Sequence, residues 1–451
     1  MKNTHLIECF FLAKYLICIY QNKKTIMKLL KFVLPLFIFS IILSCKKDDP
    51  APTTGALSGI VTNQSNQALE NAKVIAFEAT NNTPVADALT NSEGYFKFDL
   101  SGGTYYVRIS KQGYYENPRD GVTPIASQVD NGVETSVTYQ LEAIENGSFG
   151  WIQGKVTSQE QSVSGALVVA TVNQTAYSGY SDGDGDFIIH NVPAGNYAVN
   201  AWKSGFNSNA INVSVTVDTA TVGADINLSA TESGEVNGAI TFLATNNGEI
   251  DVTLNHLITG EVIPGCFTNS ENALYTISNV PNGTFEVRAT YANDTYVVDP
   301  DWIIKNGIPT ATINNNAVTQ NFSVTGAVIL NEPTNPIENT IPVEVESTTP
   351  TFSWTAYSST NDYVIEVSDV NGNIIWGGFS GEGDQVTKNI IIPKAQTSIQ
   401  FNSDGNATIS ALESGAIYRW KIYASKDDTK EATGWKLISS SEDQRGLIRV
   451  K

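Results

Sequence analysis

The sequence predicts an all-β protein built from tandem antiparallel β-sandwiches. Apolar and polar residues alternate with a period of two along many short segments, and turns rich in Gly, Asn and Asp separate these segments. This pattern is typical of small sandwiches, in which turn signals recur about every 8 to 12 residues. A series of strand and turn motifs also occurs three times, which indicates repeated domains. Beyond the N-terminal region we find no amphipathic helix of useful length.

The composition excludes several classes of function. The 451 residues include 46 acidic and 27 basic residues, which gives a net charge of −19. Because nucleic-acid binding depends largely on positive charge that faces the phosphates, we expect no nucleic-acid partner. Four Cys cannot supply a disulfide framework for a chain of this length, and three His leave little room for metal or acid–base chemistry. We therefore expect no cofactor.

The N-terminal residues predict a signal region over residues 1–44. Lys28 and Lys31 follow Met27, and a mostly apolar run comes next, from residue 32 to residue 43. Such a run is too short to cross a hydrocarbon core of about 30 Å comfortably, so it favours a signal peptide with its true start at Met27. A transmembrane anchor is the alternative interpretation.

The end of this run resembles the lipobox of bacterial lipoproteins. Residues 42–45 read Ile-Leu-Ser-Cys, and the resemblance implies that Cys45 is lipidated after cleavage and that residues 45–54 form a tether. Residues 46–49, Lys-Lys-Asp-Asp, resemble an export signal of some Gram-negative lipoproteins. That resemblance implies a lipid-anchored protein of the cell outer membrane that faces the outside. Cys266 then remains as a single thiol, which we expect to be a small core or turn residue.

Three segments of the chain share one order of strands and turns. Each segment opens with a strand that carries a Gly three residues before a Thr, at residues 57–62, 152–157 and 236–241. A second strand follows at residues 69–74, 163–168 and 250–254. A polar turn and a third strand come next at residues 90–98, 181–189 and 268–277, and an alternating strand then starts at Gly103, Gly195 and Gly283.

The polar turn of each segment is a predicted hairpin site. Its matched position holds Gly94, Gly185 and Asn272, which are residue types that tolerate a positive φ. The third copy has one extra residue before its strand, and we interpret this residue as a bulge.

In its order and spacing, this series resembles the carboxypeptidase regulatory-like family. The resemblance implies a transthyretin-like β-sandwich, related in shape to starch-binding-like folds, in each of three domains: residues 55–145, 149–229 and 234–326. The third copy departs from the pattern at its turn and second strand. Domains of this family occur on many proteins as non-catalytic modules, so the resemblance implies a fold and names no ligand.

The pattern changes after the third copy. Residues 327–349 form a polar run with three Pro, which predicts a linker. Residues 350–451 resemble a fibronectin type III domain or another immunoglobulin-like domain. The resemblance implies that Leu412 and Tyr418 form a tyrosine corner and that Trp354 lies in the core.

One short motif in the second copy matches the nucleophile elbow of hydrolases. Residues 179–183 read Gly-Tyr-Ser-Asp-Gly, but the strained turn of a hydrolase leads into a helix, and no helix follows here. The matched residues of the other copies, Thr90 and Thr268, lack these surroundings, and His190 falls at a strand end. We therefore expect no hydrolase, and no enzyme.

The Asp residues of the same turn suggest a metal site as a second interpretation. Asp182, Asp184 and Asp186 alternate with Gly, and closely spaced carboxylates of this kind can bind Ca²⁺. An EF-hand loop would need Gly at position 187 and Glu at position 193, where the chain has Phe187 and Pro193. An Asp-Gly hairpin turn explains the pattern without a metal. We expect no metal, with Ca²⁺ as the alternative.

Aromatic residues are the remaining signal for a binding site, because sugar rings stack on the faces of Trp and Tyr. Six aromatic residues are candidate ligand-binding residues: Tyr114, Tyr115, Trp202, Trp302, Trp376 and Trp435. The alternative for each is a place in a sandwich core, where most aromatic residues of alternating strands lie.

Together these observations favour a non-catalytic outer-membrane surface lipoprotein. We expect it to bind carbohydrate or another surface ligand in polysaccharide uptake or adhesion. The alternative is a structural spacer or an assembly partner of an outer-membrane transporter or secretion complex. The expected partners are the outer membrane, through the lipid anchor, and either glycans or outer-membrane protein complexes.

The anchor can be tested directly with Cys45→Ala. Because the thiol of Cys45 is the predicted site of acylation, this variant should lose both metabolic labelling by a fatty acid and retention in the membrane fraction. A variant that still sediments with membranes would contradict the lipoprotein interpretation.

Overall fold

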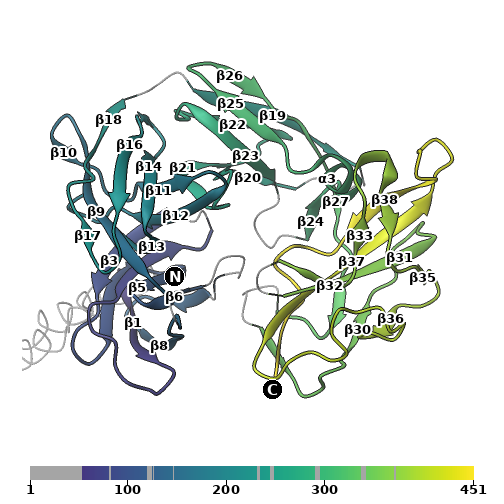
Figure 1. Ribbon diagram of the computed structural model, residues 1–451. Coiled ribbons are helices and arrows are strands. Elements are labelled where there is room, and N and C mark those ends of the chain that lie inside the picture. Colours follow the sequence, from purple (N-terminus) through teal and green to yellow (C-terminus); the bar gives the residue numbers. More distant parts are fainter. Residues whose placement is uncertain are drawn as a thin grey trace, which may run out of the picture. The chain divides into compact units, whose positions relative to one another are not determined.

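The computed structural model describes residues 53–80, 83–118, 124, 126–145, 147–230, 234–243, 248–289, 295–336, 342–369 and 372–451. Within these ranges the helices are α3 (Pro300–Asn306) and the 3-10 helix η1 (Gly383–Gln385), and the other regular elements are β-strands (Figure 1). The all-β prediction is confirmed. In this part of the chain no helix is long and apolar enough to cross a membrane. The predicted signal region and Cys45 lie outside the described residues.

The first segment folds into two sheets. In one sheet, β1 (Thr54–Asn63) pairs antiparallel with β4 (Tyr95–Ser101) and parallel with β8 (Glu134–Leu141). The other sheet has the order β3 (Thr83–Leu89), β2 (Lys73–Glu78), β5 (Gly103–Lys111) and β6 (Tyr114–Asn117), with β7 (Ala126–Val129) also paired to β5. Buried apolar side chains fill the space between the sheets, among them Leu57, Val74, Phe96, Phe98, Val107 and Ile109. This follows from the period of two, since alternate residues of a strand face the same side.

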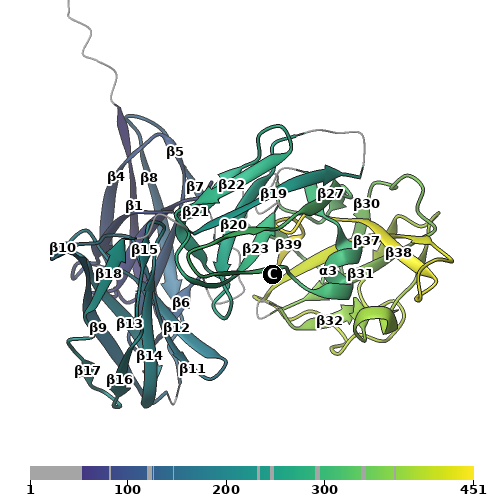
Figure 2. The same cartoon turned by 90° about the horizontal axis from the view of Figure 1, so that it is seen from above.

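The second segment repeats this arrangement. Its opening strand β9 (Phe149–Ser158) pairs antiparallel with β13 (Asp186–Pro193) and parallel with β18 (Ile226–Ala230). The short strands β10 (Gln161–Ser162), β15 (Phe206–Asn207) and β17 (Ala220–Thr221) extend this sheet. The second sheet has the order β12 (Thr175–Tyr180), β11 (Leu167–Val172), β14 (Gly195–Trp202) and β16 (Ile211–Val215) (Figure 2).

The third segment has the same pairing. Its opening strand β19 (Glu235–Phe242) is antiparallel to β22 (Leu274–Ser278) and parallel to β26 (Ala317–Thr319) and β27 (Phe322–Gly326), and β24 (Tyr296–Val298) pairs with β27. The other sheet has the order β21 (Val262–Asn269), β20 (Asp251–His256), β23 (Gly283–Ala289) and β25 (Thr310–Ile313). An unexpected helix, α3, lies between β24 and β25. Asp299 caps it by accepting a hydrogen bond from the Asp301 N–H, and Pro300 occupies its first turn.

The hairpin turns have the predicted positive φ, but the third turn lacks the predicted bulge. Gly94, Gly185 and Asn272 have φ values of +72°, +81° and +52°, which confirms the left-handed position. The predicted bulge in the third copy is wrong. Glu271 and Leu274 exchange both backbone hydrogen bonds across a two-residue turn, in which Ala273 also has a positive φ, of +61°. Two positive φ values are what a type I′ hairpin turn requires, so the third hairpin is shorter and not longer.

A hydroxyl next to each hairpin fastens the second strand to the turn. The Ser181 Oγ donates to the Val163 carbonyl at 2.7 Å and accepts from the Ala166 N–H at 2.9 Å. Thr90 makes the equivalent bonds to the Leu69 carbonyl and the Ala72 N–H. In the third copy the Ile250 N–H donates to Ser270, so Ser270, and not Thr268, is the structural match of Ser181.

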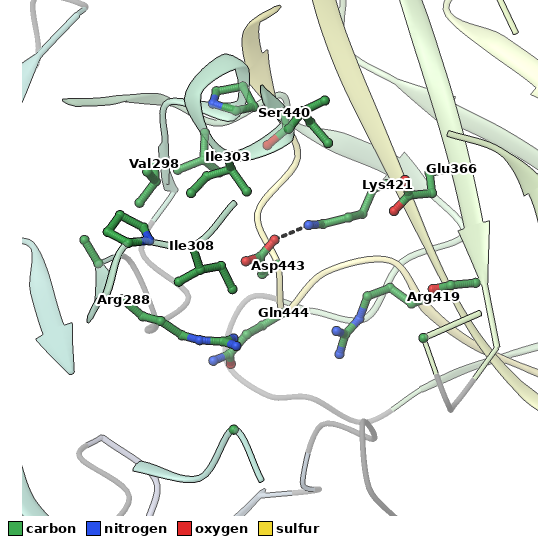
Figure 3. A pocket seen from close by; sticks show the side chains of 18 of the residues that line it. Arg288, Val298, Ile303, Ile308, Glu366, Arg419, Lys421, Ser440, Asp443 and Gln444 are labelled. Atoms are coloured by element: carbon green, nitrogen blue, oxygen red, sulfur yellow. Dashed lines mark ion pairs between the residues drawn. The ribbon is translucent and has the colours of Figure 1, made fainter. Parts of the chain in front are cut away.

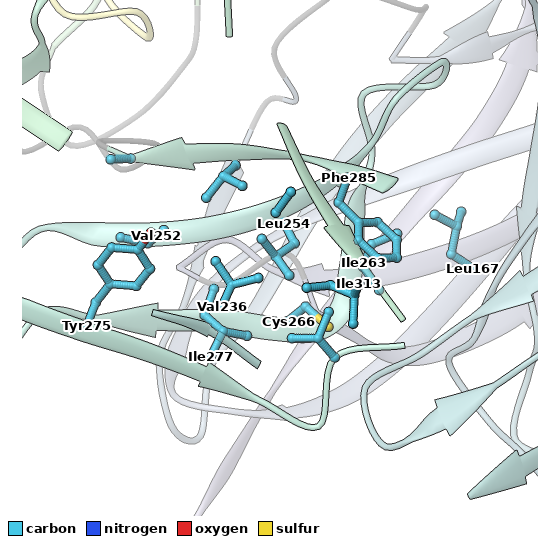
Figure 4. Close-up of a cluster of buried hydrophobic side chains, with 14 of the residues drawn as sticks. Leu167, Val236, Val252, Leu254, Ile263, Cys266, Tyr275, Ile277, Phe285 and Ile313 are labelled. Atoms are coloured by element: carbon cyan, nitrogen blue, oxygen red, sulfur yellow. The ribbon is translucent and has the colours of Figure 1, made fainter. Parts of the chain in front are cut away.

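Apolar side chains also join the three copies. One buried cluster contains residues of all three, including Phe77 and Tyr106 of the first, Leu167 and Tyr180 of the second, and Ile263, Cys266 and Phe285 of the third. Figure 4 shows Leu167 beside Ile263 and Phe285. Cys266 is fully buried, which confirms the expectation of a core residue, and this burial raises the pKa of its thiol to about 12. Lys73 adds an ion pair between copies, at 3.1 Å from Asp182.

The C-terminal segment has a seven-stranded sheet. Its order is β29 (Val343–Val345), β39 (Leu447–Val450), β37 (Ile417–Asp427), β31 (Asp362–Ser368) and β32 (Ile374–Gly377), with β35 (Ile392–Pro393) paired to β31 and β38 (Trp435–Ser440) paired to β37. A three-stranded sheet has the order β28 (Leu330–Glu332), β30 (Thr351–Trp354) and β36 (Ser398–Gln400), and β33 (Phe379–Ser380) pairs with β34 (Thr387–Lys388).

The predicted linker 327–349 is wrong in part. Its residues form β28, which pairs with β30, and β29, which pairs with β39. The Trp420 Nε1–H donates to the Pro333 carbonyl at 2.7 Å. The segment is polar and rich in Pro because both strands are short and lie at sheet edges, where Pro is tolerated.

The predicted tyrosine corner is present. Leu412 and Tyr418 are both buried, and the Glu413 N–H donates to the Tyr418 hydroxyl at 3.0 Å. Trp354 is also buried, as expected, and its ring meets Tyr363 edge to face at 5.3 Å. The resemblance of this segment to fibronectin type III remains a prediction.

The Gly of each opening strand can be tested in the second copy. A Cβ on Gly154 would lie 2.3 Å from the Ala224 carbonyl oxygen, whereas a Cβ on Gly183 would meet no atom within 4 Å. Gly154→Ala should therefore lower the free energy of unfolding by about 1–3 kcal/mol, the usual cost of overpacking. Gly183→Ala is the matched control and should leave it nearly unchanged. Equal unfolding free energies for the two variants in urea would contradict this packing argument.

Candidate binding cleft

A cavity of about 590 Å³ is lined by the third copy and the C-terminal segment, and also by Pro124 of the first copy (Figure 3). The third copy contributes β23, β24, α3 and the loop that follows α3, and the C-terminal segment contributes β31, β37 and the residues after β38. A volume of this size falls within the range of about 300–1,000 Å³ that is usual for small-ligand sites. We refer to this cavity as the cleft.

One side of the cleft is apolar. Helix α3 presents Pro300, Ile303 and Ile304 to it, residues that share a face because they are spaced i, i+3 and i+4. Val298 before the helix and Ile308 after it extend this surface.

Polar contacts fix α3 against β38. The Asp301 carboxylate accepts a hydrogen bond from the Leu437 N–H at 2.9 Å. The Lys305 ammonium lies 2.9 Å from both Asp301 and Glu431, and the Lys305 side chain is only 10% exposed. Since one cation links both segments, the apolar wall is held at a set position relative to the strands opposite.

The other side of the cleft is charged. Arg419, Lys421 and Tyr423 alternate along β37 and therefore point to one face of the sheet, and Glu366 of β31 lies opposite Lys421 in the strand register. Lys421 forms a close ion pair with Asp443. Arg288 enters from β23 and is paired with Glu286 at 2.6 Å.

Burial and charge together shift the pKa values of these groups. Burial disfavours the Lys421 cation, but the carboxylates of Asp443 and Glu366 outweigh this effect and raise the pKa of Lys421 above its usual value. Partial desolvation also opposes ionisation of Asp443, whose side chain is still 64% exposed, yet Lys421, Arg419 and Arg288 hold the pKa of this carboxyl below its usual value. For Glu366, burial dominates and raises the pKa. The Lys421–Asp443 pair therefore stays ionised, while burial makes Glu366 harder to ionise than an exposed carboxyl.

A comparison with known protein families finds a match for part of the chain. The family model described as "Carboxypeptidase regulatory-like domain" matches residues 56–140 and 151–241. The chain contains two carboxypeptidase regulatory-like domains. The first match lies within the first segment, and the second covers the second segment and continues to residue 241 in β19. The rest of the third segment repeats the strand pairing without a match to that model. No curated protein matches the chain.

Several solved structures are similar over parts of the chain. The Bacillus anthracis TIE protein is 15% identical with a TM-score of 0.18, over 61% of this chain and 51% of that one. BcpA, the major pilin subunit of Bacillus cereus, is 14% identical with a TM-score of 0.17, over 61% and 100%. A leucine-rich repeat protein from Bacteroides thetaiotaomicron is 14% identical with a TM-score of 0.20, over 39% and 26%. The chain thus spans about half the length of the first, and at these TM-scores the likenesses support no conclusion on function.

The six predicted aromatic residues do not line the cleft. Trp376 is wrong as a surface platform, because it is 2% exposed and its Nε1–H donates to Asp404 at 2.8 Å. Trp302 on α3 and Tyr115 in the first carboxypeptidase regulatory-like domain are 53% and 40% exposed. These two remain available to a ligand elsewhere on the surface.

The other three aromatic residues are half-buried. Trp202 packs edge to face on Phe285, with ring centroids 5.4 Å apart, and so belongs to the contact between the second regulatory-like domain and the third copy. Trp435 lies 4.6 Å from the Lys388 ammonium. Tyr114 is held in β6.

The two motifs of the second regulatory-like domain have structural roles. Ser181 is 4% exposed and its hydroxyl is engaged by backbone groups, while His190 lies 3.1 Å from the hydroxyl of Ser110. The Asp182 carboxylate accepts from the N–H groups of Asp184 and Asp186 and pairs with Lys73. Across the described ranges, no group of three or more His, Cys, Asp or Glu could hold a metal ion.

Sequence reasoning missed the residues of the cleft. Arg288, Arg419 and Asp443 are far apart in the chain, and each follows the ordinary alternation of its strand or loop. The one available signal was the rarity of Arg, since the sequence has six, two of which line the cleft.

The raised pKa of Glu366 has a measurable consequence. Its folded pKa is raised, so its contribution to stability is complete below the unfolded pKa near 4.5 and is lost as the pH rises through the folded value. Glu366→Gln should therefore raise the melting temperature relative to wild type at pH 8 but not at pH 4. Glu382→Gln, at an exposed position in the same segment, is the control and should differ from wild type equally at both pH values. The same difference at pH 4 and pH 8 for Glu366→Gln would argue against a raised pKa of this carboxyl.

Proposed function

We propose that this protein is a non-catalytic surface lipoprotein of the outer membrane that binds carbohydrate, in polysaccharide uptake or adhesion, through the cleft. The observation that carries the proposal is the construction of the cleft: an apolar wall from α3 faces a charged wall from β37. Sugars present both kinds of surface, since C–H groups pack on apolar side chains while hydroxyls pair with charged groups.

The absence of catalysis is part of the proposal. Carboxypeptidase regulatory-like domains are non-catalytic, and two of them make up much of the chain. The hydroxyl of Ser181, in the nucleophile-like motif, is used to fasten a strand. In the cleft, the ionised Lys421–Asp443 pair lacks the lowered lysine pKa that a nucleophilic amine needs.

The surface location rests on the N-terminal residues. The cationic and apolar run that ends at Cys45 is what a lipoprotein signal requires, and Lys46 to Asp49 match an export signal to the outer face. An anchored protein with an excess of acidic residues would also be repelled by an anionic cell surface, which favours projection of its domains away from it.

A structural spacer or assembly partner is the second candidate function. The buried cluster shared by the three copies favours it, because continuous apolar contact makes neighbouring sandwiches stiff relative to one another. The two functions are distinguished by whether the cleft binds a ligand.

A glycan array with the full chain in detergent tests the proposal. Ile308→Trp places a large side chain in the cleft and should weaken binding of any recognised glycan by about tenfold or more. Ile391→Trp, at a 63% exposed position of the C-terminal segment outside the cleft, is the matched control and should bind as wild type does. No binding by wild type to any glycan would reject the carbohydrate function and favour the spacer.

A further inference from the structure

A β-bulge adds one Asn to the second and third copies, at the far end of the strand that follows the hairpin turn. The register of β13 with β9 shifts by one residue at Asn191, whose φ is +56°. In the third copy the Val280 N–H donates to the Gly234 carbonyl, which leaves Asn279 as the extra residue, with a φ of +57°. A bulge re-aims the groups of its strand, and a positive φ at a residue other than Gly persists where the surroundings hold it. We refer to Asn191 and Asn279 as the bulge asparagines.

The first copy lacks this bulge along its described strands. Its β4 pairs with β1 in an unbroken register, from Thr54 opposite Ser101 to Ile60 opposite Tyr95. The residues before this copy are the predicted tether, whereas the second and third copies each follow another copy. The bulge asparagine therefore occurs in the two copies that have another copy before them.

At the first junction, Asn191 holds the turn between β5 and β6 of the preceding copy. The Gly113 N–H donates to the Asn191 Oδ1 at 2.7 Å, and the Asn191 Nδ2 donates to the Tyr114 carbonyl at 2.8 Å. Gln112 of the same turn accepts from the Asn191 N–H at 3.0 Å and donates to the Phe149 carbonyl at 3.1 Å. The side chain and the backbone of Asn191 are thus both bonded to the copy before it.

The second junction uses the matched turn and the matched bulge. The turn between β14 and β15 lies against Asn279, whose carbonyl accepts from the Gly205 N–H at 2.7 Å and from the Ser204 Oγ at 3.3 Å. Beside it the Asn282 N–H donates to the Asn207 Oδ1 at 2.7 Å. At both junctions, therefore, a Gly N–H of one copy donates to the bulge asparagine of the next copy.

The Gly of this turn follows the same rule as the bulge. Gly113 and Gly205 have φ values of +81° and +84°, a conformation that Gly adopts freely and that presents the N–H of the turn to the next copy. The third copy is followed by the C-terminal segment, and its sequence has no Gly between Gly283 and Gly307. The Gly turn and the bulge asparagine thus occur as a pair, once at each junction.

The two kinds of contact at the junctions differ in what they determine. Apolar contact is non-directional, so the cluster shared by the copies explains their adhesion better than their relative angle. Hydrogen bonds are directional, and a single polar residue within an apolar contact can select one register, as an Asn does in coiled coils.

We propose that the bulge asparagine is the docking site through which a copy binds the Gly turn of the copy before it, and that this contact fixes the angle between the two copies. The apolar cluster supplies the adhesion, while Asn191 and Asn279 supply the orientation. The proposal goes beyond the carbohydrate function and holds whether or not the cleft binds a ligand.

Spin labels on the full chain test the first junction. Val133→Cys in the first copy and Val222→Cys in the second place the labels at positions that are 51% and 71% exposed, while Cys266 is buried and stays unlabelled. The N-terminal thiols are removed in this background by Cys9→Ser, Cys18→Ser and Cys45→Ser. Double electron–electron resonance then measures the distribution of distances between the two labels. With the junction intact, this distribution should be single and narrow.

Asn191→Gly removes the side-chain amide from the junction and keeps a residue that adopts a positive φ freely. The distance distribution should broaden by about twofold or more, because two hydrogen bonds that orient the turn are lost. Asn173→Gly is the matched control, since Asn173 is exposed in the same copy and also has a positive φ, of +54°. Its distribution should equal that of the labelled chain without this change.

Each outcome decides the proposal without reference to the cleft. A folded Asn191→Gly variant that keeps the narrow distribution overturns it, and so does equal broadening in Asn173→Gly. Thermal unfolding establishes that each variant is folded. If Asn191→Gly does not fold, Gln112→Ala takes its place, because it removes two hydrogen bonds from the other side of the junction. Broadening in Gln112→Ala then supports the proposal, and a narrow distribution overturns it.

Discussion

In each of the three repeated segments, one glycine allows the opening strand to lie very close to the backbone of the neighbouring strand, and the fold of the segment depends on this contact. The glycine of each opening strand is Gly59, Gly154 or Gly238. An added Cβ there would lie 2.6, 2.3 and 1.8 Å, in that order, from a backbone carbonyl oxygen that belongs to the closing strand or to the residues just before it. The opening strand can therefore pair with a hairpin strand on one side and take the closing strand in parallel on the other. The first sheet of each copy is built on that arrangement.

Much of the fold could be predicted because its signals are local. The turn positions at Gly94 and Gly185 are visible in the sequence, since only some residue types tolerate a positive φ. The corner at Tyr418 is implied by the resemblance to fibronectin type III domains, and its contact is also local, because the hydroxyl accepts from the N–H of Glu413, five residues earlier. Each of these features depends on residues that are near one another in the chain.

The sequence-based predictions were wrong where the structure depends on contacts between residues that are far apart in the chain. Residues 330–332 and 343–345 are strands only because β30 and β39 offer edges to them, which a polar and Pro-rich segment does not reveal. Trp376 packs in the core against Phe401, and Asp404 accepts the hydrogen bond of its indole nitrogen. The cleft is the clearest example, because Arg288 of the third copy and Asp443 of the C-terminal segment are far apart in the chain and meet only in the folded protein.

The buried thiol of Cys266 can be used to detect local unfolding of the third copy. It is the one free cysteine in the part of the chain that the structure describes, its side chain is inaccessible, and its thiol is held in the unreactive protonated form. A thiol reagent can then reach it only when the third sandwich opens. The rate of alkylation of the full chain would thus measure the opening of a single domain without a tag.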